Sequence, residues 1–314
     1  ETFMASQEEY NATMVSLCAQ VASGYINLRQ LQQELDVVKK NCASQEEVLK
    51  ITEVRYNTGL VSKLDVLQAK SVYYSTKASI PTIEAGIIQY INSLAVLLGV
   101  YPADLRPSLE KIGPLPDYME LVSVGIPANL LRRRPDVRGA ERTVNAQAAL
   151  LGASKSDWLP QFFLKGSVGY ASKDMKNFAE KKSLTYEIAP SFTWTLFNGT
   201  KLVNATKLAR AQLDEAINQY NQTVLTAVQE VDNAMSTYQN SIKQIVALRE
   251  VLNQGQQTLK LSLELYKQGL TPFQNVLDAQ RSLLSYENSL VEAKGNSLLC
   301  LIQMYQALGG GWQE

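Results

Sequence analysis

The polar residues best placed to act on a charged solute follow two glycines in this sequence. Asp65 follows Gly59, and Asn275 and Asp278 follow Gly269. Asn275 and Asp278 are three positions apart, so in a helix their side chains share one face. Acidic side chains that gather on one surface favour cations. The plainer alternative is that Asp65 and Asp278 are solvated carboxylates on exposed helix faces.

Residues for catalysis or metal binding are scarce. The 314 residues include no His, which removes the commonest general base and the commonest metal ligand. The cysteines, Cys18, Cys42 and Cys300, are scattered without a CxxC pair, so they predict neither a zinc site nor a disulfide framework. The sequence has no nucleophile-elbow motif and no phosphate-binding loop motif. We therefore predict a protein that is not an enzyme and that uses no cofactor and no metal.

The charge balance argues against a nucleic-acid partner. The sequence has 30 Lys+Arg and 30 Asp+Glu, so it lacks the basic surplus that neutralises phosphates. The one short basic run, residues 132–134, is expected to pair with carboxylates such as Asp136 or Glu141. No run of about 18 apolar residues occurs, so no membrane-spanning helix is predicted.

Long helices must position the residues that follow the glycines. Apolar or small residues recur at three-to-four spacing over residues 1–58, which is the pattern of one long helix. Gly59 breaks it, and a second helix is predicted for residues 62–98, with Gly99 as its C-cap. Pro81 lies inside this second helix and is expected to kink or split it.

The second half of the chain repeats this arrangement. A helical pattern runs over residues 201–267, breaks at Gly269 and resumes over residues 272–308. A shift of 210 positions superposes the two helix pairs without a gap, so that Tyr56 matches Tyr266 and Gly59 matches Gly269. A long amphipathic hairpin cannot bury its apolar stripe alone. We expect the two hairpins to stack and other copies of the chain to complete a closed oligomer.

Two segments between the helix pairs have a period of two. In residues 161–170 and 184–197, apolar side chains alternate with polar or small ones. Strands of about ten residues with aromatic residues near their ends are typical of transmembrane barrels. The alternative is an ordinary amphipathic hairpin that lies on the helices, and Pro190 would remove one ladder donor in either case. A helix over residues 135–156 is predicted before these strands.

Several motifs together resemble the TolC-like outer-membrane factor family. They are the glycine turns "YNTGLVSKLDVLQA" and "YKQGLTPFQNVLDAQ", the stretch "IPANLLRRRPDVRGAE" and the segment "ASKSDWLPQFFLKGSVGY". The "LLRRRPDV" element is similar to the OprM/NodT-type branch, which serves multidrug efflux pumps. The resemblance covers nearly the whole chain. It implies a mainly α fold, with two long antiparallel α-helical hairpins and one β-hairpin that forms part of a trimeric transmembrane β-barrel.

For function, the resemblance implies a passive exit duct of a tripartite drug efflux system. The duct would lie in the outer membrane of a Gram-negative bacterium, with its helical part in the periplasm. The implied partners are two further copies in a homotrimer, a periplasmic adaptor (membrane fusion) protein, an inner-membrane pump of the RND type and outer-membrane lipid. A type I protein-secretion duct and a non-channel coiled-coil scaffold are the alternatives.

One departure from the family concerns the number of strands. Family members have two strands in each of two repeats, whereas this chain has only the second pair. We therefore expect an N-terminally truncated fragment of a family member, which alone should not close the barrel.

The resemblance assigns the glycine turns to contacts with the adaptor. The matching residues are Arg55, Gly59, Leu60, Gly269 and Leu270. The simpler explanation for the glycines is that they break the helices, since a tight reversal between helices needs a residue of this kind.

The resemblance assigns the polar residues beyond the turns to a constriction. Asp278 matches one of two carboxylates in the family's constriction ring, and Asn275 replaces the other, which should weaken the charge of the ring. Asp65 and Tyr266 match residues that are linked across neighbouring helices in the closed state.

The predicted organisation has six parts. They are a first long helical hairpin (1–99), an equatorial loop with short helices (100–134), a helix leading to the barrel (135–160), two barrel strands with an extracellular loop (161–197), a second long helical hairpin (198–308) and a tail (309–314).

Overall fold

The computed structural model describes residues 1–116, 133–171, 173 and 181–310 of the chain. The chain divides into two compact units. The first comprises Glu1–Glu9 and Asp136–Leu225, and the second comprises Tyr10–Pro135 and Thr226–Glu314. Residues 117–132 of the predicted equatorial segment and most of the predicted extracellular loop lie outside the described residues.

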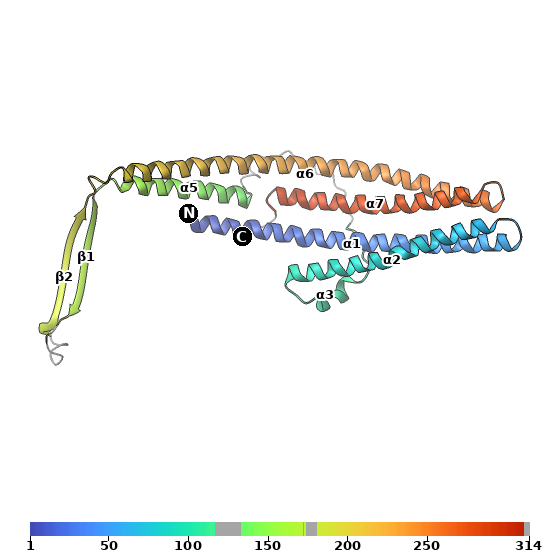
Figure 1. The fold of residues 1–314 in the computed structure, drawn as a ribbon, viewed down its shortest axis with the longest axis horizontal. Coiled ribbons are helices and arrows are strands. Elements are labelled where there is room, and N and C mark those ends of the chain that lie inside the picture. The colour runs from blue at the N-terminus through green and yellow to red at the C-terminus, as the bar shows by residue number, and fades with distance from the viewer. Residues whose placement is uncertain (117–132, 172, 174–180, 311–314) are drawn as a thin grey trace. The chain divides into compact units, whose positions relative to one another are not determined.

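The first helical hairpin consists of α1 (Thr2–Asn57) and α2 (Lys63–Leu98), close to the predicted bounds (Figure 1). Apolar residues at three-to-four spacing give each helix one apolar stripe, and the two stripes pack together. This core contains Leu28, Leu35, Val38, Ile83, Ile87, Ile91 and Leu94. The φ of 68° at Gly99 confirms the predicted left-handed cap.

Pro81 does not split α2, which runs unbroken from Lys63 to Leu98. Pro81 lies on the exposed side of the helix, while Thr76 before it and Ile83 after it are buried. Packing on both sides of the proline therefore holds the helix together across the missing hydrogen bond. By length and composition alone α2 could cross a membrane, which the sequence did not predict, but its apolar stripe packs on α1 as a core helix does.

A short helix, α3 (Pro102–Leu109), follows the first hairpin. Polar side chains of α1 donate hydrogen bonds to the end of α3 and to the residues just after it. Gln32 Nε2 donates to the Leu109 carbonyl at 2.6 Å, and Arg29 Nη1 donates to the Lys111 carbonyl at 2.9 Å. The described part of the predicted equatorial segment therefore contains one short helix and an irregular stretch that binds α1.

The second helical hairpin consists of α6 (Lys201–Lys267) and α7 (Phe273–Ala307), and α6 continues through Gly255 as predicted. Two apolar clusters join α6 to α7; they contain Val231, Ala234, Tyr238, Leu301, Met304 and Ala307, and Ile245, Leu290 and Ala293. Arg134 is almost fully buried, donates to the Ala307 carbonyl at 2.9 Å and pairs with Glu230 at 2.7 Å. Glu230 is thus one carboxylate that pairs with the basic run, and Arg132 lies outside the described residues.

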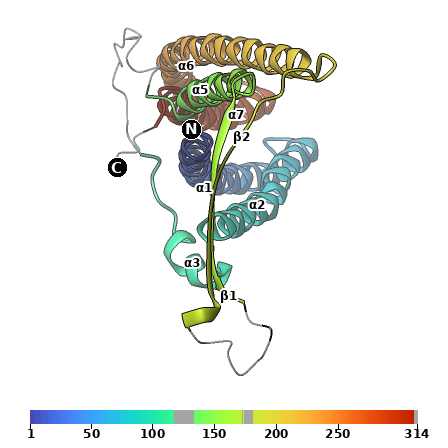
Figure 2. The ribbon, with the colours of Figure 1, turned by 90° about the vertical axis from the view of Figure 1, so that its left-hand side faces the viewer.

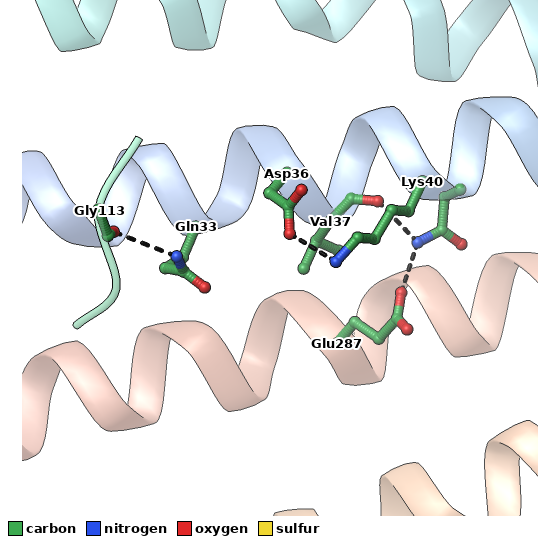
Figure 3. Close-up of polar contacts among 7 residues, drawn as sticks. Gln33, Asp36, Val37, Lys40, Gly113 and Glu287 are labelled. Atoms are coloured by element: carbon green, nitrogen blue, oxygen red, sulfur yellow. Dashed lines mark hydrogen bonds and ion pairs between the residues drawn. The ribbon is translucent and has the colours of Figure 1, made fainter. Parts of the chain in front are cut away.

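Within the second unit, α1 lies beside α2 on one side and α7 on the other (Figure 2). The contact between α1 and α7 is largely polar in its middle part. Asn41 donates to Glu287 of α7, next to the ion pair of Lys40 with Asp36 at 2.7 Å (Figure 3). Nearer the turns all four long helices share an apolar cluster, which contains Val48, Leu49, Val66, Ala69, Val72, Tyr266, Phe273, Val276 and Leu277.

The first unit contains α5 (Pro135–Ser156) and the β-hairpin of β1 (Gln161–Tyr170) and β2 (Leu184–Thr193). The antiparallel register pairs Phe162 with Phe192 and Leu164 with Pro190. Because paired residues share a face, the apolar side chains of both strands lie together on one face, as the alternation predicted. Phe162, Leu164, Val168, Ile188 and Phe192 on this face are between 67% and 81% exposed.

The second strand is shorter than predicted, since β2 ends at Thr193 rather than near Phe197. At this end of the hairpin, hydrogen bonds of two tryptophans join the segments before β1 and after β2 and the helix α6. Trp194 Nε1 donates to the Trp158 carbonyl at 3.1 Å, and Trp158 Nε1 donates to Thr206 Oγ1 of α6 at 3.2 Å. Trp194 thus leaves the ladder to bond the segment before β1.

Candidate functional site

The two glycine turns have the same backbone geometry. Gly59 and Gly269 both have a φ of 77°, and each donates to a tyrosine carbonyl, Tyr56 at 2.9 Å and Tyr266 at 3.0 Å. The next residues, Leu60 and Leu270, are 67% and 70% exposed. A left-handed residue at the helix end is the usual way to close the last turn, and it favours glycine. The turns therefore present one exposed leucine each.

The first turn uses its carboxylate to begin α2. Ser62 is the N-cap, its hydroxyl accepts from the Asp65 N–H, and the Asp65 carboxylate accepts from the Ser62 N–H at 3.3 Å. This reciprocal pair is a capping box, which satisfies two N–H groups that the helix itself cannot bond. Asp65 thus has a local structural role in this structure.

The second turn begins α7 differently, because Pro272 is its N-cap and has no side-chain hydrogen bond. Asn275 Nδ2 donates to Thr271 Oγ1 at 2.6 Å. The Asp278 carboxylate accepts from Gln274 Nε2 at 2.9 Å, and Arg281 Nη1 lies 4.0 Å from it. Asp278 is therefore held by side chains of its own helix.

Asn275 and Asp278 line one groove between α6 and α7. The groove has a volume of about 570 Å³, and α6 contributes Glu250, Gln254 and Thr258 to it. Asn275 and Asp278, two of the predicted constriction residues, thus line the same groove. Asp65 and Tyr266 do not line this groove.

Tyr266 lies in the apolar cluster of the four helices and is 2% exposed. Its ring packs on Phe273 with centroids 5.1 Å apart, and its hydroxyl has no hydrogen-bond partner. Burial raises the pKa of the Tyr266 hydroxyl, and the nearby Thr52 hydroxyl and Arg55 guanidinium partly offset this rise. Among the described residues no hydrogen bond joins Tyr266 to Asp65, although Asp65 is close enough to affect the same pKa.

Arg55 differs from the other residues assigned to the adaptor. Its side chain is half-buried and points to the second turn, where Nη1 donates to the Lys267 carbonyl at 2.6 Å. Its guanidinium carbon lies 4.8 Å from the centre of the Tyr266 ring. Leu60 and Leu270, in contrast, are open to solvent.

Sequence reasoning did not single out three side chains at these turns, Ser62, Gln274 and Arg281. Their signals are local: Ser62 and Asp65 have the spacing of a capping box, and Gln274 and Arg281 lie one helical turn on either side of Asp278. In the part of the chain that the structure describes, no group of three or more His, Cys, Asp or Glu residues could hold a metal ion.

Comparison with known proteins places this geometry in context. The family described as outer membrane efflux protein matches residues 1–100 and 126–310. The antibiotic efflux pump outer membrane protein ArpC of Pseudomonas putida is 30% identical over the whole chain. The toluene efflux pump outer membrane protein TtgI of Pseudomonas putida is 31% identical over 99% of it. A solved structure of the outer-membrane channel OprN is 30% identical, with a TM-score of 0.92, and covers 100% of this chain and 70% of that one.

The arrangement of two long helical hairpins and one β-hairpin is that of TolC-like outer-membrane channels, and the matching family is one of outer membrane efflux proteins rather than of enzymes. The chain belongs to the outer membrane efflux protein family. It is therefore a protein of the outer membrane of Gram-negative bacteria. The chain spans 64% of the length of ArpC and 66% of that of TtgI.

Proposed function

We propose that the protein is a passive exit duct across the outer membrane, gated at the turns of its helical hairpins. The observation that carries the proposal is the β-hairpin, which leaves aromatic and branched side chains such as Phe162 and Ile188 exposed on one face. Exposed apolar faces of this size are costly in water and are stable against lipid. We propose that this face meets the bilayer as part of a barrel, and the membership of the chain in the outer membrane efflux protein family supports this.

The duct would serve a tripartite system. Its partners are two further copies of the chain in a homotrimer, a periplasmic adaptor (membrane fusion) protein and an inner-membrane pump of the RND type. The named substrates of the relatives, an antibiotic for ArpC and toluene for TtgI, support small organic compounds as cargo. The six-part division of the chain into hairpins, equatorial segment, strands and tail belongs to this proposal.

The gate would lie at the turns. Asp278 and Asn275 share a groove on α6 and α7. Three copies of Asp278 in a trimer would form a ring with one Asp278 carboxylate per chain. Opening would be an iris-like rotation of the hairpins that frees Asp65 and Tyr266 from their closed-state link. The exposed Leu60 and Leu270, supported by Gly59, Gly269 and Arg55, would present the contact surface for the adaptor.

The other two functions have less support. In a coiled-coil scaffold, the apolar face of the β-hairpin would stay exposed to water, which is costly. A type I protein-secretion duct would share the fold, but the relatives reported above are named as parts of efflux pumps.

The proposal is tested by extraction of the full-length protein from membranes, followed by chemical cross-linking. We expect extraction only with detergent and cross-linking to a trimer. Extraction by salt or alkaline buffer without detergent would contradict a duct and favour the scaffold.

A further inference from the structure

Arg55 joins the two hairpins of one chain at their turns. It lies in the last turn of α1, and Nη1 donates to the carbonyl of Lys267, the last residue of α6, at 2.6 Å. The same guanidinium lies over the Tyr266 ring, 4.8 Å from its centroid. Both partners belong to the other hairpin, so one side chain makes two contacts across the repeat.

The chemistry of this contact suits an arginine. The last carbonyls of a helix have no partner within it and carry partial negative charge, which a cation near the C-terminus satisfies. A planar guanidinium also stacks on aromatic rings, and an ammonium group does so less well. Arg55 can therefore cap the end of α6 and cover Tyr266 at once.

The internal repeat shows that this contact is not a general property of the turns. The position of the second repeat that matches Arg55 is Leu265, and the position of the first that matches Tyr266 is Tyr56. Tyr266 is 2% exposed, whereas Tyr56 is 41% exposed. Among the described residues, an arginine covers Tyr266 but not the equivalent Tyr56.

The surroundings of Tyr266 make Arg55 important for its position. The Tyr266 hydroxyl is buried without a hydrogen-bond partner, and Arg55 Nε is also buried without one. Phe273 packs on the ring from within the cluster. Thr52, whose hydroxyl donates to the Val48 carbonyl, lies near the Tyr266 hydroxyl but does not cover the ring. Among the described residues, Arg55 is thus the polar group that covers the ring and also bonds the backbone beside it.

The geometry points to Arg55 as a positioning residue for the gate: it latches the turn of the first hairpin to the end of α6 and holds Tyr266 in the buried position that it has in this structure. This inference rests on the proposed exit duct. Arg55 then makes a contact within the chain, unlike the exposed Leu60 and Leu270. The turn of the first hairpin would thereby affect the position of the second turn. Loss of the latch should loosen the end of α6 and favour opening.

The test compares Arg55→Ala with Lys63→Ala in the full-length protein. Lys63 is exposed at the same turn. Lys63→Ala therefore removes one positive charge, as Arg55→Ala does, without removing the contacts of Arg55 with Lys267 and Tyr266. Two readouts are used: single-channel conductance in a planar bilayer, and amide hydrogen exchange of residues 263–272 in detergent. Loss of a charged hydrogen bond and a cation–π contact should speed exchange there by about tenfold or more.

We expect Arg55→Ala to raise the closed-state conductance and to speed exchange, whereas Lys63→Ala does neither. Equal behaviour of the two variants would overturn the latch. If Arg55→Ala does not assemble, Arg55→Lys replaces it. The conductance and the exchange rate of Arg55→Lys should then lie between the wild-type values and those expected for Arg55→Ala. Wild-type values of both quantities for Arg55→Lys would overturn the latch. If no protein conducts, the exit duct fails, and hydrogen exchange still decides whether Arg55 holds the end of α6.

Discussion

At the scale of single residues, the sharpest constraint lies in the backbone of the two turns. Gly59 has a φ of 77°, and a Cβ built on it meets no atom within 4 Å. A side chain at this position would therefore fit, but the left-handed conformation costs roughly 1–2 kcal/mol for residues other than glycine.

We expect Gly59→Ala to lower the free energy of unfolding by about 1 kcal/mol, and Gly59→Asn to lower it less, because asparagine tolerates the left-handed region. Thermal unfolding of the full-length protein in detergent measures both. Equal losses for the two variants would mean that something other than backbone conformation sets the cost.

The roles of single residues were harder to predict from sequence than their positions. Asp65 and Asp278 were expected to face a pore or solvent, which stays a prediction. The structure adds short-range partners for both, a capping box for Asp65 and Gln274 for Asp278. Their spacing to these partners is visible in the sequence. The contact of Arg55 with Lys267 joins residues 212 positions apart, so no local pattern predicts it.

At the scale of helices, packing decides the effect of a small residue. A Cβ added at Gly255 of α6 would lie 2.8 Å from a ring carbon of Tyr286 on α7. Gly152 of α5 also lies within a helix, but nothing lies within 4 Å of its added Cβ. Alanine is better than glycine inside a helix by about 1 kcal/mol, whereas overpacking costs about 1–3 kcal/mol.

Gly255→Ala should therefore destabilise the protein by up to about 2 kcal/mol, while Gly152→Ala should stabilise it by up to about 1 kcal/mol. The two midpoints of thermal unfolding, compared with wild type, give the signs directly. A gain of stability for both variants would show that Tyr286 moves aside without cost.

The polar contact between α1 and α7 predicts a dependence on pH. Burial, and secondly the carboxylate of Glu292, raise the pKa of Glu34 above its ordinary range. A carboxyl group whose pKa is raised by folding costs no stability below its ordinary pKa. The cost appears as the pH rises towards the folded-state value.

Glu34→Gln should therefore raise the unfolding temperature at about pH 7 and change it little at about pH 4. Glu264→Gln, at an exposed position of α6, serves as the control and should leave the unfolding temperature unchanged at both pH values. A gain for Glu34→Gln that is the same at both pH values would exclude ionisation of Glu34 as its cause.

Periodicity predicted the helices and strands well, because each repeats one pattern over many residues. α5 has the predicted bounds, and the register of β1 and β2 places the apolar side chains on one face. Tertiary contacts explain two departures from local rules. Of the two expected effects of Pro81, a kink or a split, the split does not occur, because packing continues on both sides of the proline. Trp194 leaves β2 to bond the Trp158 carbonyl, so this strand is shorter than predicted.

At the scale of the whole molecule, one chain leaves surfaces that further copies would cover. Tyr56, Leu64 and Leu67 near the first turn are between 41% and 61% exposed, although the equivalent tyrosine of the second repeat is buried. The β-hairpin likewise has only two strands, which a barrel must continue. Both features support the proposed homotrimer, in which equivalent surfaces meet around a closed ring.

Single-channel recording of the full-length protein in a planar bilayer tests directly whether the protein conducts ions. We predict a small, cation-selective conductance whose selectivity for cations falls in Asp278→Ala, because that carboxylate is the charge of the proposed ring. A conductance that Asp278→Ala does not change would move the constriction away from Asp278. The absence of conductance from inserted, verified trimers would contradict the exit duct itself.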